Sequence, residues 1–193
     1  KIRENTNVVT DMGLSFVGTH QTIKTKIGQN IFTNSGHAPM GWGLPASIGA
    51  FFAKKDYQTI SLNGEGGFMM NIQELATVMH HNLDIKIFIF NNGGYQTIKQ
   101  TQQLGFDGRL MGCDESSGIS FPSFSKIAEA SKIGYKCIRN HKELDDKLTD
   151  ILSISGPVVI EIMIDPEQPQ IPKAVNKRLP NGKSQASNFE DLY

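Results

Sequence analysis

A carboxylate and an asparagine follow two successive strand-like runs of the chain, and each stands among glycines. Glu65 lies in the loop GEGG at 64–67, and Asn92 lies in the loop NNGG at 91–94. A βαβ unit brings the carboxyl ends of neighbouring parallel strands side by side, so we expect these two side chains to meet. Carboxylate, amide and backbone carbonyl oxygens form the hard ligand set that Mg²⁺ takes, with phosphate oxygens completing its octahedron. The paired loops therefore predict a site for Mg²⁺ and a diphosphate group.

The glycine loop by itself is compatible with two interpretations. Glycines let a backbone approach a phosphate at a helix N-terminus, but a G-x-G turn also serves plain strand-to-helix geometry. The dinucleotide-binding pattern G-x-G-x-x-G is not completed, because Met69 stands at its third glycine position. No acidic residue ends the next strand-like run to bind a ribose. A Rossmann-type site is therefore disfavoured, and Asn92 is the residue that favours a phosphate loop.

The composition excludes several classes of protein. The 193 residues fit one domain with a sizeable core, and 19 basic residues balance 19 acidic ones, which argues against a nucleic-acid platform. No apolar run of the sequence approaches the roughly 18 residues that a membrane-spanning helix needs. Cys113 and Cys137 have no metal-binding spacing, so we predict reduced thiols in a cytoplasmic protein. We expect neither nucleic acid nor membrane among its partners.

Short apolar runs alternate with amphipathic segments along the chain, as in α/β proteins. The runs at 59–63, 85–90 and 158–164 are apolar nearly throughout, which is typical of parallel strands buried on both faces. We predict a three-layer α/β sandwich with a mainly parallel sheet of five or six strands flanked by helices.

Two segments lie outside this alternation. Residues 103–122 hold four glycines without a sustained period, so we expect a long loop or flap there. Residues 166–193 contain four of the eight prolines. We interpret them as a C-terminal arm of the domain that spans 1–165.

The segment from 64 to 92 resembles the cofactor motif of thiamine-diphosphate-dependent enzymes, in which G-D-G is followed by N-N at a similar spacing. The segments VVTDMG and NSGHAPMGWGLPASIGA further resemble acetolactate synthase and its relatives. The resemblance implies thiamine diphosphate and Mg²⁺ as cofactors, and it maps the metal ligands to Glu65, Asn92 and the carbonyl of Gly94. Glu65 is one methylene longer than the aspartate of the family, which puts the metal affinity in question.

The resemblance also implies which residues hold the thiamine. Met40 would be the apolar wedge under the bent cofactor, unless it is an ordinary core methionine, and the carbonyl of Ala38 would accept a hydrogen bond from the aminopyrimidine. Ser15 would donate to a phosphate oxygen, whereas Leu14 could not. His37 is either a proton relay or a loop histidine with a hydrogen-bonding role. The other residues assigned to the cofactor or substrate are Gly36, Gly64, Gly66, Gly67, Tyr95 and Ile98.

By the same resemblance, the chain is the diphosphate-binding domain of a larger enzyme. The glutamate that activates thiamine belongs to a pyrimidine-binding domain, which no motif here resembles, so we expect no catalytic residue in this chain and no turnover by it alone. That domain and a central domain are expected in the same or a partner chain. The whole enzyme, a homodimer or homotetramer, would decarboxylate a 2-oxo acid, with pyruvate expected, and could pass the enamine to an acceptor carbonyl.

Acetolactate formation itself is left open, because Thr101 stands where acetolactate synthases commonly have a tryptophan. Two rival functions are also open. One is a non-catalytic assembly or regulatory relative in which Glu65 marks a degenerate metal site. The other is a Mg²⁺-dependent phosphotransfer or nucleotide-binding domain that uses the same loop.

Overall fold

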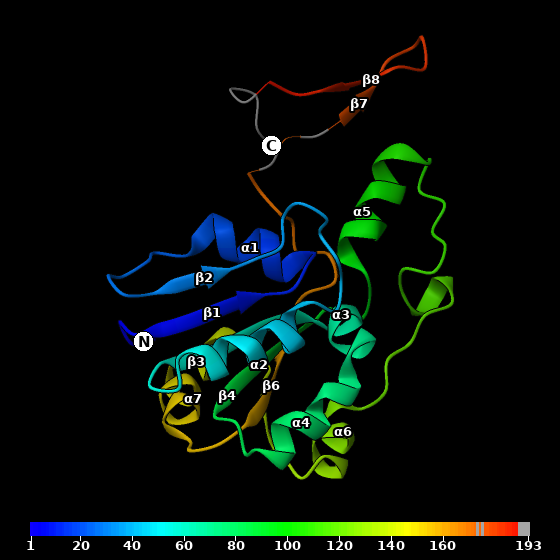
Figure 1. The fold of residues 1–193 in the computed structure, drawn as a ribbon. Helices are drawn as coiled ribbons and strands as arrows, with labels where there is room; N and C mark the ends of the chain where they lie inside the picture. Colours follow the sequence, from blue (N-terminus) through cyan, green and yellow to red (C-terminus); the bar gives the residue numbers. More distant parts are fainter. Residues whose placement is uncertain (173, 175, 189–193) are drawn as a thin grey trace.

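The structure is a computed structural model, and it describes residues 1–172, 174 and 176–188. Six strands form one sheet in the order β2-β1-β3-β4-β6-β5, and every neighbouring pair is parallel (Figure 1). These strands are β1 (Thr6–Thr10), β2 (Asn30–Phe32), β3 (Gln58–Gly64), β4 (Ile85–Asn91), β5 (Gly134–Ile138) and β6 (Val158–Met163). A separate antiparallel hairpin is formed by β7 (Asn176–Arg178) and β8 (Ser184–Ala186).

Helices pack on both faces of the sheet, because the central strands are apolar on both sides. Ile85, Ile87 and Ile89 of β4 pack against residues of α2 (Gly43–Ala53), α3 (Glu65–Met70), α4 (Leu75–His80) and α6 (Phe124–Ala130). Phe88 of β4 packs on the opposite face with Ile60 of β3 and residues of α7 (His141–Ser153). This alternation gives three layers, so the predicted α/β sandwich with a parallel sheet is confirmed.

The order of the strands creates a crevice at the carboxyl edge of the sheet. The chain leaves β1 in one direction to form β2, and returns past β1 to form β3 on its other side. The helices that follow β1 and β3 therefore start on either side of the gap between them, where α/β proteins bind their ligands. The register pairs Thr10 with Leu62 and Gly64 with Phe90. The loops after β1, β3 and β4 consequently meet at this edge.

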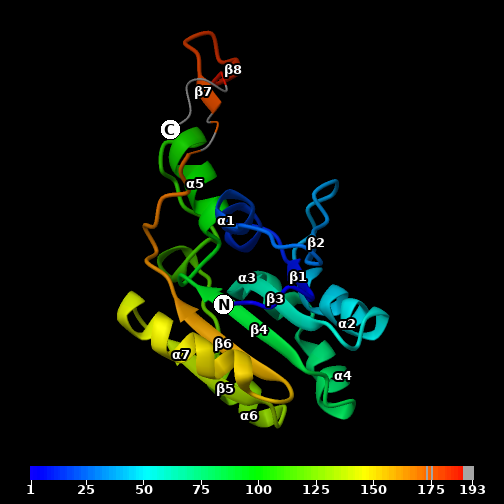
Figure 2. The same ribbon diagram turned by 90° about the vertical axis from the view of Figure 1, so that its left-hand side faces the viewer.

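Some elements differ from the sequence-based expectation. The six strands of the sheet agree with the expected five or six, but the sequence did not place two elements, the three-residue β2 at the edge of the sheet and α1 (Leu14–Thr22), which follows β1. Helix α5 (Gln96–Gly105) projects beyond the arrowheads of β4 and β6 (Figure 2). The loop expected at 103–122 therefore begins after Gly105. It contains a short 3₁₀ helix, η2 (Glu115–Ser117), and its Asp114 forms an isolated β-bridge with Gly94. A further 3₁₀ turn, η1 (Ile72–Glu74), separates α3 from α4.

Two other sequence-based expectations concern cysteines and membrane helices. Cys113 and Cys137 are both free thiols. Within the described ranges, no helix combines the length and apolar character that crossing a membrane would take.

Candidate functional site

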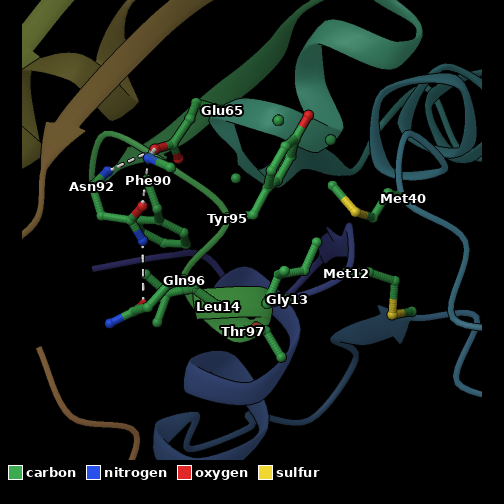
Figure 3. Close-up of a pocket in the computed structure, with 15 residues that line it drawn as sticks. Met12, Gly13, Leu14, Met40, Glu65, Phe90, Asn92, Tyr95, Gln96 and Thr97 are labelled. Carbon is green, nitrogen blue, oxygen red and sulfur yellow. Dashed lines mark hydrogen bonds between the residues drawn. The ribbon is translucent and has the colours of Figure 1, made fainter. Parts of the chain in front are cut away.

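A cavity of about 60 Å³ lies at the crevice, where the loops after β1, β3 and β4 meet. Figure 3 shows its lining side chains, with Tyr95 between Glu65 on one side and Met40 on the other. The lining residues are Met12, Gly13, Leu14, Met40, Gly64, Glu65, Gly66, Gly67, Phe90, Asn92, Gly94, Tyr95, Gln96, Thr97 and Ile98. The two loops that the sequence paired therefore form one wall of a single cavity.

Glu65 is the first residue of α3, and its side chain reaches across to the loop after β4. Its Oε1 accepts hydrogen bonds from the backbone N–H of Asn92 at 3.0 Å and from that of Gly94 at 2.8 Å (Figure 3). The residue is 1% exposed. A carboxylate at the N-terminus of a helix also faces the positive end of the helix dipole, which favours its charged form.

Asn92 turns its amide oxygen toward the same point. Its Oδ1 accepts from the Gly94 N–H at 3.1 Å, and its Nδ2 donates to Gln96 Oε1 at 3.2 Å. The Glu65 Oε1 and the Asn92 Oδ1 thus converge on one N–H group. Two oxygens that follow neighbouring strands and share one donor lie close enough to act together as ligands of one cation.

The electrostatics of Glu65 call for a positive partner. Burial raises the pKa of the Glu65 carboxyl above its usual value, and hydrogen bonds from backbone N–H groups, including that of Gly94, oppose the rise. Among the described residues, no lysine, arginine or histidine forms a salt bridge with it. Burying a carboxylate without a counter-charge is costly, and a divalent cation would remove that cost.

The donor set fits a hard cation. The described residues hold no cluster of three or more His, Cys, Asp or Glu side chains that could bind a metal, so a metal here would depend on amide and carbonyl oxygens. Asn92 and the carbonyl of Gly94 offer such oxygens beside the single carboxylate of Glu65. They would leave several positions of a Mg²⁺ octahedron to water and to phosphate. These residues could therefore hold a Mg²⁺ ion that is shared with a bound diphosphate.

Three glycines of this wall are explained by close approaches. A Cβ atom at Gly66 would stand 1.8 Å from Tyr95 Cε1, and one at Gly67 would stand 1.6 Å from Asp11 Oδ2. A Cβ at Gly94 would lie 2.2 Å from the carbonyl oxygen of Cys113. Any side chain at these positions would displace its neighbour, so part of the glycine pattern serves packing. At Gly64, by contrast, nothing lies within 4 Å of the Cβ position, which leaves space beside the cavity.

Asp11 holds the loop that carries Met40. It follows β1, is 0% exposed, and accepts hydrogen bonds from the Gly41 N–H at 3.2 Å and the Gly43 N–H at 3.0 Å. Asn71 fixes the same loop by donating to the Gly41 carbonyl at 2.7 Å. Burial raises the pKa of the Asp11 carboxyl, and the hydrogen bond from Gly43 opposes this most. Met40 is therefore presented to the cavity by a backbone that is tied at two points.

Several residues expected at the site lie elsewhere in the structure. Ser15 is buried in the first turn of α1, where its hydroxyl donates to the Met12 carbonyl at 3.2 Å, and it does not line the cavity. Gly36, His37 and Ala38 form an exposed stretch of the loop before Met40 and also lie outside the lining. Ala38 has a φ of 48°, an unusual value for a residue with a Cβ.

The cavity also contains residues that the sequence did not single out, chiefly Met12, Gly13, Phe90, Gln96 and Thr97. Asp11 was missed as well, although it stood within the segment VVTDMG. Two features of the sequence indicate the polar residues Asp11 and Gln96. Asp11 is an acid directly after a buried strand, and Gln96 is a polar residue that closely follows the loop carrying Asn92.

Comparisons with known proteins place the chain in a family. Residues 11–162 match the family described as "Thiamine pyrophosphate enzyme, C-terminal TPP binding domain". A probable acetolactate synthase large subunit of Methanococcus aeolicus is 33% identical over 165 residues, which cover 86% of this chain and 27% of that protein. The acetolactate synthase isozyme 2 large subunit of Escherichia coli K12 is 34% identical over 158 residues, which cover 82% of this chain and 28% of that protein.

The chain thus spans less than a third of the length of these curated relatives. The family match, by contrast, covers most of the chain and includes β3, β4 and the loops after β1, β3 and β4 that form the cavity. This chain belongs to the family of C-terminal thiamine-pyrophosphate-binding domains of thiamine pyrophosphate enzymes.

Proposed function

We propose that this chain holds Mg²⁺ and thiamine diphosphate in a larger acetolactate-synthase-like enzyme that decarboxylates a 2-oxo acid, with pyruvate as the expected substrate. The observation that carries the proposal is the convergence of Glu65 Oε1 and Asn92 Oδ1 on the Gly94 N–H inside the crevice. The family membership supports the cofactor, and the names of the relatives support the class of reaction.

In this proposal, the chain binds and orients the cofactor. Glu65, Asn92 and the Gly94 carbonyl hold the cation, and the loop at 64–67 lets the diphosphate approach the backbone. Met40, fixed through Asp11, supports the thiamine ring, while the carbonyl of Ala38 accepts from its aminopyrimidine. When bound, thiamine diphosphate supplies the carbon nucleophile and the electron sink for loss of CO₂.

The remaining assignments of the site follow the same proposal. The proposal assigns Gly36 and His37 to the pyrimidine end of the cofactor, and Tyr95 and Ile98, which line the cavity, to its reaction side. Ser15 was expected to donate to a phosphate oxygen, but its hydroxyl donates to the Met12 carbonyl, so the proposal gives it no contact with the diphosphate. No catalytic proton transfer is assigned to this chain. Transfer of the product fragment to an acceptor carbonyl is the carboligase version of the same proposal.

The proposal requires domains beyond the thiamine-diphosphate-binding domain at 1–165 and its C-terminal arm at 166–193. We assign the glutamate that activates thiamine to a pyrimidine-binding domain, which with a central domain lies in the same or a partner chain of a homodimer or homotetramer. Apolar side chains exposed at the cavity and beyond it support a contact there, since Ile98 is 40%, Phe106 55% and Met111 80% exposed. The two free thiols suit a cytoplasmic enzyme.

Calorimetry of the full-length enzyme tests the site. Thiamine diphosphate is titrated with and without Mg²⁺ into the wild type, Asn92→Ala and the control Asn5→Ala. Asn5 is an exposed asparagine that precedes β1, at the opposite edge of the sheet. We expect Mg²⁺-dependent binding in the wild type and the control, and its loss in Asn92→Ala.

The two alternative functions give different results in calorimetry with thiamine diphosphate and with nucleotides. A non-catalytic relative with a degenerate site would show no Mg²⁺-dependent binding of thiamine diphosphate in the wild type. A phosphotransfer or nucleotide-binding domain would bind ATP or NAD in a way that thiamine diphosphate does not displace. Either result would reject the proposed function.

The reaction is tested separately with pyruvate. Release of CO₂ would support decarboxylation, and formation of acetolactate would support transfer to a second pyruvate. Release of CO₂ without acetolactate would restrict the function to a decarboxylase. This outcome has to be checked because Thr101 stands where acetolactate synthases commonly have a tryptophan.

A further inference from the structure

Gln96 is a buried polar residue that contacts the proposed cation site without belonging to it. It is the first residue of α5 and is 5% exposed. Its Oε1 accepts from Asn92 Nδ2 at 3.2 Å, and its Nε2 donates to the backbone carbonyl of Gln168, at the start of the C-terminal arm. The side chain thus joins the end of β4 to the segment that follows β6.

The orientation of this side chain is dictated by a backbone group. A carbonyl oxygen can only accept a hydrogen bond, so the Gln168 carbonyl requires the NH₂ end of the Gln96 amide. The oxygen end of Gln96 must then face Asn92. An amide oxygen there can be met only by a donor, which is the NH₂ end of Asn92.

The orientation of the Asn92 amide is also fixed at its other end by a backbone group. The Gly94 N–H can only donate, so it requires the oxygen end of the Asn92 amide. Two fixed backbone groups, the Gln168 carbonyl and the Gly94 N–H, therefore stand at the ends of one chain of hydrogen bonds. Each amide between them has one orientation that satisfies its neighbours, and this orientation points Asn92 Oδ1 to the Gly94 N–H, from which Glu65 Oε1 also accepts.

The orientation matters for a cation, because only the oxygen of an amide can bind it. We propose that Gln96 is a positioning residue that holds the Asn92 amide with its oxygen toward the cation. This inference rests on the proposed function, since it presumes that Glu65 and Asn92 bind a divalent ion. Partners behind a metal ligand typically change metal affinity by about 10- to 100-fold when they are removed.

The test uses Mn²⁺ as a spectroscopic probe in the full-length enzyme with thiamine diphosphate present. Electron paramagnetic resonance counts free and bound Mn²⁺ without any turnover. Gln96→Met has a similar length but replaces the amide oxygen by a thioether, which is only a weak acceptor, so we expect Mn²⁺ to bind about tenfold or more weakly. Gln96→Glu keeps an acceptor facing Asn92 Nδ2, so we expect it to bind Mn²⁺ at least as tightly as the wild type.

Two control variants separate the outcomes. Gln103→Met changes an exposed glutamine of the same helix and should leave Mn²⁺ binding unchanged. Gln96→Asn keeps the amide but is one methylene too short to meet both partners. It should weaken Mn²⁺ binding like Gln96→Met, and it takes that variant's place if Gln96→Met does not fold.

The inference would be overturned if Gln96→Met or Gln96→Asn bound Mn²⁺ like the wild type while Asn92→Ala had lost binding. It would equally fail if Gln96→Glu lost as much affinity as Gln96→Met, since the acceptor would then not be what matters. Absence of Mn²⁺ binding in the wild type would instead reject the proposed function itself, and this inference with it.

Discussion

The side chain of Glu65 accepts a hydrogen bond at 3.0 Å from the backbone N–H of Asn92, 27 positions later in the chain. The same oxygen accepts from Gly94, so the carboxylate already bridges the two loops of the proposed cation site. A glutamate has the reach for this bridge, whereas the aspartate of the family motif is one methylene shorter. The extra length therefore connects the loops in the protein alone, and these hydrogen bonds would compete with the proposed cation for the same oxygen.

Replacing Glu65 should separate stability from cation binding. Glu65→Asp should lose the bridge and lower the free energy of unfolding by about 1–3 kcal/mol, the usual cost of leaving a buried N–H group without an acceptor. That group is the Asn92 N–H, since the Gly94 N–H keeps Asn92 Oδ1 as an acceptor. Its shorter carboxylate should bind Mn²⁺ at least as tightly as the wild type. Urea unfolding in EDTA and Mn²⁺ titration with thiamine diphosphate measure the two quantities.

Glu65→Gln is the matched control, because it keeps the acceptor for both N–H groups and removes the charge. We expect it to unfold at a urea concentration no lower than that of the wild type, and to bind Mn²⁺ more than tenfold more weakly. Wild-type Mn²⁺ affinity in Glu65→Gln would show that this carboxylate is not a ligand.

A methyl group at Gly66 should disrupt the wall of the cavity. Its Cβ would stand 1.8 Å from the Tyr95 ring, so Gly66→Ala must displace that ring, and overpacking of this kind costs about 1–3 kcal/mol. The control Gly49→Ala lies on the exposed side of α2 with nothing within 4 Å of its Cβ position, and it should stabilise the protein by up to ~1 kcal/mol. Urea unfolding compares the two, and equal midpoints would contradict the packing account.

The loops that carry this chemistry were readable from the sequence, for a physical reason. Glu65 and Asn92 each follow a strand that is buried on both faces, and parallel strands bring such positions to one edge. Short or weakly patterned elements were missed. Strand β2 has three residues at the edge of the sheet, and the apolar residues at the start of α1 give way to Gly18 and polar residues without a sustained stripe.

Long-range hydrogen bonds were beyond reach for a different reason. The hydrogen bonds from the Gly43 N–H to Asp11 and from Gln96 to the Gln168 carbonyl join positions whose spacing follows no period. The type of a residue indicates that its amide or carboxylate needs hydrogen-bond partners when it is buried. It does not indicate which backbone groups supply them. The close approach of Asp11 to Gly67 likewise depends on how β1 and α3 pack.

Asp11 should make stability depend on pH. Burial raises the pKa of its carboxyl above the value of 3.8 expected in the unfolded chain, so the folded state binds this proton more tightly. The free energy of unfolding contributed by this group is therefore highest below pH 3.8, and it falls as pH rises through the folded-state pKa. Asp11→Asn cannot titrate and should lack this slope.

Urea midpoints of the wild type and Asp11→Asn, measured across the acid range, check this expectation through their difference. The difference cancels the other carboxylates, which titrate alike in both proteins. Parallel curves at all pH values would show that Asp11 has the same pKa in the folded and unfolded states.

The ion pair between Lys99 and Glu167 should connect α5 weakly to the C-terminal arm. Lys99 Nζ lies 2.7 Å from Glu167 Oε1 and 3.5 Å from Asp114 Oδ2, and the hydrogen bond to Glu167 is the main cause that raises the pKa of Lys99. Glu167 is 69% exposed, so water and salt screen the pair. A double-mutant cycle of Lys99→Met and Glu167→Gln, read by urea unfolding, should give a coupling of about 0.2–1 kcal/mol at low salt that shrinks as salt is added. A coupling that stayed unchanged in high salt would mean that packing of the lysine stem against the segment at Glu167, and not charge, joins that segment to α5.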